Sequence, residues 1–180
     1  MLKPIFLIFI IWAVTLTNAK GQLTKGNWLV GGNGSFIIQE QNLFGDRIAS
    51  NRLQLSPNIG YFFHDKLAVG LKPRLDILKY TNSGFRSVVR AGSVGPFLRY
   101  YLLPEDKLLN LLTEVNYQYL FGMSNSGRDI YTLSAGPVVY FNSSIGLEFT
   151  VNYELMNIKD SNTDTKTLFF GLGFQVHLGN

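Results

Sequence analysis

The sequence predicts an all-β protein, namely an eight-stranded antiparallel up-and-down transmembrane β-barrel. Three observations support this prediction. Apolar and polar residues alternate with a period of two along most of the chain, which is the period of a β-strand. The alternating segments are longer than the usual length of about five or six residues for a strand in a soluble protein. The connections between the segments alternate between short and long, as they do when hairpins turn on opposite sides of a membrane.

The first 21 residues have the pattern of a secretory signal peptide. Lys3 supplies a positive charge, and the ten residues 5–14 form an unbroken apolar run. Smaller and more polar residues follow, and two cleavage positions fit the pattern, after Ala19 and after Gly21. A membrane-spanning helix needs about 20 apolar residues, and this run is too short. We therefore predict a cleaved signal peptide at 1–21 and an exported barrel domain at 22–180.

The composition narrows the class of protein further. The chain has no cysteine, so an exported domain must be held together by other means than disulfides, such as a closed sheet. Its formal net charge of +4 is too small to indicate nucleic-acid binding. Charged residues make up 16% of the chain, below the usual value of about 25%. No second apolar run is long enough for a spanning helix, so a membrane protein of this kind must be a barrel.

Segment 145–155 illustrates the alternation. Its odd-numbered residues, from Ile145 to Leu155, are all apolar, whereas its even-numbered residues are Gly, Glu, Thr and Asn. Segments 67–77, 111–119 and 168–178 repeat this two-faced pattern. Eight predicted strands of this type cover residues 26–38, 51–63, 67–78, 87–102, 108–122, 129–142, 145–156 and 167–178.

The connections fall into two groups. Three are short, at residues 64–66, 103–107 and 142–144. Four are longer and rich in Gly, Asn, Ser, Thr and Asp, which predicts exposed loops, at residues 39–50, 79–86, 123–128 and 157–166. If the N-terminus lies in the periplasm, all four longer connections face the outside of the cell. This arrangement is typical of outer-membrane barrels.

A proline-centred repeat marks three of the hairpins. Pro57, Pro96 and Pro137 are 39 and 41 residues apart, one hairpin per repeat. Each proline is followed by aromatic residues that we predict to lie at the periplasmic interface of the membrane: Tyr61, Phe63, Tyr100, Tyr101, Tyr140 and Phe141. Proline removes a donor from the sheet, so these positions require local bulges or bends.

The segments 95–101, 135–141 and 171–178 resemble those of small eight-stranded outer-membrane barrels of the OmpA and OmpX type. The resemblance covers the whole mature chain and implies the outer membrane of a Gram-negative bacterium. It also implies two partners, the outer-membrane lipids and the barrel-assembly machinery during insertion. In such proteins the last strand often ends in an aromatic residue and acts as an assembly signal. This chain ends instead in Leu178-Gly179-Asn180, a departure from the pattern.

Charged residues occur on the polar faces of the predicted strands, which face the lumen of a membrane barrel. They are Lys72, Arg74, Asp76, Arg99, Glu114, Glu148 and Glu154. Side chains fill the interior of an eight-stranded barrel, and an unpaired buried charge is costly. We therefore predict a structural network of paired charges that plugs the lumen, with a narrow ion path as the alternative. A soluble lipocalin-like barrel would reverse the two faces and place the charges outside.

No catalytic or metal-binding constellation is evident in the sequence. His64 lies in a short turn beside Asp65, and His177 lies on an inward face with a hydrogen-bonding role expected. We predict a non-enzymatic barrel without cofactor, with a structural or surface-interaction role. The alternatives are a minor porin and, less favoured, a lipid-modifying outer-membrane enzyme. The expected protein is a monomer that does not bind nucleic acid, with extracellular ligands possible at its loops.

Overall fold

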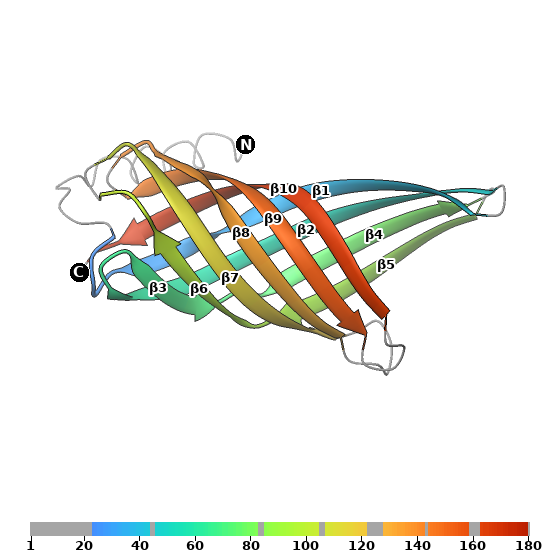
Figure 1. Ribbon diagram of the computed structural model, residues 1–180, viewed down its shortest axis with the longest axis horizontal. Helices are drawn as coiled ribbons and strands as arrows, with labels where there is room; N and C mark the ends of the chain where they lie inside the picture. The colour runs from blue at the N-terminus through green and yellow to red at the C-terminus, as the bar shows by residue number, and fades with distance from the viewer. Residues whose placement is uncertain are drawn as a thin grey trace, which may run out of the picture.

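The computed structural model describes residues 23–43, 46–82, 85–104, 107–121, 128–142, 144–158 and 163–179. The predicted signal peptide lies outside this range. The strands are β1 (Trp28–Leu43), β2 (Asp46–His64), β3 (Leu67–Leu71), β4 (Arg74–Asn82), β5 (Phe85–Val94), β6 (Pro96–Tyr101), β7 (Leu109–Phe121), β8 (Arg128–Tyr140), β9 (Ile145–Ile158) and β10 (Thr163–Leu178). Each pairs antiparallel with its neighbours in one sheet (Figure 1). The prediction of an all-β chain is confirmed.

The ten strands form eight continuous lines around the barrel wall, each running from one end of the barrel to the other, and we call these lines staves. β3 and β4 form one stave that is interrupted at residues 72–73, and β5 and β6 form another that is interrupted at Gly95. The ring closes where β1 pairs with β10, beginning with Trp28 opposite Leu178. The predicted eight-stranded antiparallel up-and-down barrel is therefore confirmed.

The prolines lie at interruptions of the ladder, which explains how a closed sheet accommodates them. Pro57 of β2 pairs with Gly32 of β1 on one side. On its other side, the ladder of β2 with the stave formed by β3 and β4 is interrupted at the level of Pro57. Pro73 lies in that interruption. Pro96 and Pro137 likewise pair with the preceding stave and lie at gaps in the ladder with the following one. Each missing N–H therefore coincides with a gap in the ladder.

The outer surface of the barrel is apolar and its interior is polar. Large apolar side chains face outward, and Phe36, Leu168 and Phe170 are 61%, 66% and 76% exposed. The inward-facing Arg99 and Glu148 are 2% and 1% exposed. This orientation is that of a membrane barrel and the reverse of a soluble lipocalin-like barrel. No helix in the described part of the chain is long and apolar enough to cross a membrane.

Two of the six predicted interfacial aromatic residues, Tyr101 and Tyr140, point into the barrel, so that part of the prediction is wrong. Successive side chains of a strand point to opposite faces. Tyr100 and Tyr101 therefore cannot both face the lipid. The remaining four lie on the outer surface: Tyr61, Phe63, Tyr100 and Phe141.

Three of the longer loops are much shorter than predicted. β1 continues to Leu43 and β2 begins at Asp46, within the predicted loop 39–50. Within the predicted loop 79–86, β4 ends at Asn82 and β5 begins at Phe85. Within the predicted loop 157–166, β9 ends at Ile158 and β10 begins at Thr163. In these segments the hydrogen-bonded ladder continues beyond the apolar belt of the barrel. Strands there need no apolar face, and their residues are therefore polar. Of the predicted loop 123–128, only residue 128 lies in the described part, where β8 begins.

The two ends of the barrel differ (Figure 1). We call the end with the short turns the closed end, because there the ring of staves is continuous. At the opposite end, β1, β2, β4 and β5 diverge from β7–β10 (Figure 1). β1 pairs with β10 only from Trp28 to Gly34, and β5 pairs with β7 only from Gly92 to Val94. Two seams therefore open at this split end.

Candidate functional site

All seven predicted lumenal charges lie inside the barrel and are buried. They are Lys72, Arg74, Asp76, Arg99, Glu114, Glu148 and Glu154. Period-two alternation on their strands turns each of them towards the lumen. Together with Arg52 they form two separate groups of ion pairs, which we call the inner quartet and the outer quartet.

The inner quartet consists of Lys72, Arg99, Glu114 and Glu148. Arg99 is the register partner of Glu114, and its Nη2 lies 2.7 Å from Glu114 Oε2. Its Nη1 also lies 2.7 Å from Glu148 Oε1, across the lumen on β9. Lys72 forms an ion pair with the other oxygen of Glu114. Two cations and two carboxylates thus give the inner quartet no net charge.

The outer quartet consists of Arg52, Arg74, Asp76 and Glu154. Arg74 Nε lies 2.8 Å from Asp76 Oδ2, and Arg74 Nη1 lies 2.5 Å from Glu154 Oε2. Arg52 Nη1 lies 3.1 Å from Glu154 Oε1. This quartet is also neutral. Arg52 is not among the seven predicted lumenal charges, although alternation between Leu53 and the polar residues on either side of it places Arg52 inside.

An aromatic and aliphatic cluster lines the lumen at the closed end. His177 packs against three rings, with centroid distances of 5.6 Å to Phe62, 5.8 Å to Tyr101 and 5.6 Å to Tyr140. Leu23, which is 1% exposed, belongs to the same cluster. The N–H of Lys66 donates to the carbonyl oxygen of Leu23 at 2.6 Å and fixes the segment that precedes β1. This cluster, which we call the aromatic floor, lies inside the barrel at the closed end.

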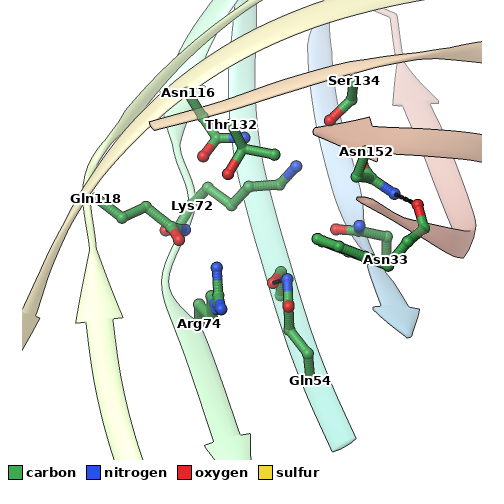
Figure 2. A pocket seen from close by; sticks show the side chains of 11 residues that line it. Asn33, Gln54, Lys72, Arg74, Asn116, Gln118, Thr132, Ser134 and Asn152 are labelled. Atoms are coloured by element: carbon green, nitrogen blue, oxygen red, sulfur yellow. Dashed lines mark hydrogen bonds between the residues drawn. The ribbon is translucent and has the colours of Figure 1, made fainter. Parts of the chain in front are cut away.

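A small polar cavity lies between the two quartets (Figure 2). The volume open to the centre of a water molecule is about 10 Å³, roughly what one water needs. Its lining comes from almost every stave: Asn33, Gln54, Ser56, Lys72, Arg74, Asn116, Gln118, Thr132, Ser134, Asn152 and Phe169. Four buried lining atoms have no protein hydrogen-bond partner in the described part of the chain: Asn33 Oδ1, Gln54 Oε1, Asn116 Oδ1 and Thr132 Oγ1. The cavity is therefore polar, and water fits it.

We expect Thr132→Val to lower the free energy of unfolding by about 1 kcal/mol. Valine has nearly the same shape as threonine, so the substitution removes the hydroxyl and leaves the packing unchanged. A water in the cavity would lose one of its partners. Equilibrium unfolding in detergent measures the change. An increase in stability would contradict the prediction, because it would show that the hydroxyl is buried without any partner.

The two histidines lie in different surroundings at the closed end of the barrel. His64 is exposed in the turn after β2, where its Nδ1 lies 3.2 Å from the carbonyl oxygen of Asp65. His177 is enclosed by the aromatic floor. No three His, Cys, Asp or Glu side chains in the described part of the chain lie where they could hold a metal ion. The lumenal charges pair with one another in the two neutral quartets.

Comparisons with known proteins bear on the fold. No protein-family description matches the sequence, and no curated protein matches it either. The crystal structure of the outer membrane protein OprG from Pseudomonas aeruginosa is similar, with a TM-score of 0.56 and 16% identity over 89% of this chain and 100% of that one. The fold of this chain is thus that of small outer-membrane β-barrels.

Two further solved structures match less closely. The N-terminal β-barrel domain of OprF from Pseudomonas aeruginosa has a TM-score of 0.48 and 12% identity, over 86% of this chain and 98% of that one. Neisserial surface protein A has a TM-score of 0.47 and 16% identity, over 84% of this chain and 99% of that one.

Proposed function

We propose that the protein is an integral outer-membrane β-barrel whose lumen is closed to solutes and whose role is structural or surface-interacting. The observation that carries this proposal is the set of buried side chains inside the lumen. Two neutral quartets occupy its middle, and the aromatic floor lies between them and the closed end. A filled interior is what an eight-stranded barrel of this width accommodates. In this proposal the protein is not an enzyme.

The location in the outer membrane is supported by the apolar outer surface and by the similarity of fold to OprG. A bilayer core contains no water, so only helices and closed barrels can span it. On this proposal the chain is exported through residues 1–21 and inserted by the barrel-assembly machinery as a monomer. Outer-membrane lipids then surround it, and the split end presents its hairpins to extracellular ligands.

We expect the folded protein to show no single-channel conductance in planar lipid bilayers. Each ion that crosses the lumen would have to pass the two groups of buried ion pairs, and disrupting such pairs is strongly unfavourable because it leaves buried charges uncompensated. It would also have to pass the aromatic floor. Clear, reproducible channel events would contradict the closed lumen and would favour the alternative, a minor porin. The polar cavity between the quartets is the observation that favours this alternative.

A gel experiment tests the membrane location separately from the closed lumen. A barrel folded in detergent should migrate differently before and after boiling, because the closed sheet resists unfolding by detergent alone. We expect such a shift for the purified protein. A chain that remains soluble without detergent and shows no shift would contradict the membrane proposal. The mass of the protein isolated from the membrane would show whether residues 1–21 have been removed.

A further inference from the structure

Three cations lie together on the outer surface of β4 and β5, near the split end. Lys79 of β4 is opposite Val88 of β5, and Arg86 and Arg90 are the next residues on the same face on either side of Val88. All three cationic side chains are exposed. Diagonal neighbours on one face of a sheet lie about 7–8 Å apart, which long side chains can bridge. The three cationic groups can therefore converge on one ligand.

This cation cluster, formed by Lys79, Arg86 and Arg90, spans the border of the apolar surface: Arg90 pairs with Ile77 on the apolar side, and Lys79 and Arg86 lie beyond it. On β2 the outward-facing residues change from Leu53 to Asn51, and on β4 they change from Ile77 to Lys79. The two changes occur at the same level, because Leu53 pairs with Ile77 and Asn51 with Lys79. The border of the apolar belt in a membrane barrel is the level of the lipid headgroups.

The charge of the cluster is not neutralised within the described part of the chain. No ion pair involves its three cations there. The nearest carboxylate on the same strands, that of Asp76, points into the lumen and pairs with Arg74. The cluster therefore presents three positive charges to the headgroup level. Arg offers a planar fork of donors and Lys a compact charge, and both bind phosphate oxygens well.

We propose that Lys79, Arg86 and Arg90 bind the phosphate groups of a phosphorylated lipid in the leaflet around the split end. The acyl chains of the lipid lie along the apolar surface next to the cluster, over Leu53 and Ile77. The lipid thus makes a charged contact and an apolar contact at once, whereas free phosphate makes only the first. This inference rests on the proposed membrane location and specifies one lipid-binding surface on the barrel.

The test compares the wild type with the triple variant Lys79→Gln, Arg86→Gln and Arg90→Gln. Each protein is folded in uncharged detergent, and binding of a bisphosphorylated glycolipid (lipid A) and of its dephosphorylated form is measured by native mass spectrometry. The control variant is Lys25→Gln with Lys107→Gln, which removes exposed cations at the closed end. Each cation near a lipid surface contributes about a factor of five in affinity. We therefore expect a loss on the order of 100-fold for the triple variant and little change for the control.

The outcomes separate this inference from the proposed function. Equal binding by the wild type and the triple variant, or equal binding of the two lipids, would overturn the site. Displacement of the lipid by millimolar inorganic phosphate would overturn the choice of a lipid as the ligand. The boiling shift on a gel is recorded for every variant. If the wild type shows no shift, the membrane proposal itself fails, whereas a shift without lipid discrimination overturns the lipid site alone.

Discussion

Arg99→Met is expected to lower the free energy of unfolding by about 3–5 kcal/mol, because it leaves buried carboxylates without their partner. The guanidinium of Arg99 bonds Glu114 and Glu148 at once, and all three side chains are at most 2% exposed. Without Arg99, only Lys72 remains to balance two buried negative charges. Equilibrium unfolding in detergent or lipid vesicles measures the change, with fluorescence of Trp28 as one probe.

Two further variants control this experiment. Arg99→Met combined with Glu148→Gln leaves the neutral pair Lys72–Glu114, so the double variant should recover much of the lost stability. Arg90→Met makes the same substitution on the outer surface, where the expected change in uncharged detergent is within about 0.5 kcal/mol. If the single variant Arg99→Met is as stable as the wild type, the inner quartet does not hold the barrel together.

Gly136→Ala is expected to have the second large effect, lowering the free energy of unfolding by about 3 kcal/mol. This is the upper end of the usual destabilisation by overpacking. Gly136 precedes Pro137, and at this position β8 and β9 approach closely. A Cβ atom built at Gly136 would lie 1.9 Å from the carbonyl oxygen of Phe149. The obstacle is backbone and cannot rotate away, so the two strands must separate. Unfolding in denaturant measures the cost.

Gly34→Ala is the matched control for Gly136→Ala. Gly34 also lies in a strand, but a Cβ there would meet nothing closer than 3.5 Å, the side chain of Leu55. Alanine should fit at this site and leave the stability within about 1 kcal/mol of the wild type. Equal effects at Gly34 and Gly136 would show that the close approach beside Pro137 is not required by the fold.

The sequence could predict the staves and their faces because alternation is a local property. Residues 145–155 show this clearly, since every even residue is buried and every odd one is exposed or half-buried. The same rule, applied fully, would have placed Tyr101 and Tyr140 inside, each next to an outward-facing aromatic residue. It would also have added Arg52 to the lumenal charges.

The pairing of the charges could not be predicted from the sequence. Arg99 reaches Glu114 because the two are register partners, but it reaches Glu148 across the lumen, from β6 to β9. That contact depends on how far the staves are staggered around the ring, which alternation does not determine. The length of the outer hairpins was misjudged for a related reason. Above the membrane, the ladder continues through residues whose polarity is typical of loops.

The limited ladder between β1 and β10 has a consequence for how the chain folds. Closure joins Trp28 to Leu178, from opposite ends of the domain. Bringing such distant segments together lowers the conformational entropy of the chain before stabilising contacts have formed. Chains dominated by non-local contacts therefore fold slowly. The other short ladder joins β5 and β6 to β7. The strands before and after this ladder each pair with their neighbours in sequence, so we expect them to form first as two half-barrels. We expect the joining of the two halves, by pairing of β1 with β10 and of β5 and β6 with β7, to be the late and slow step of folding.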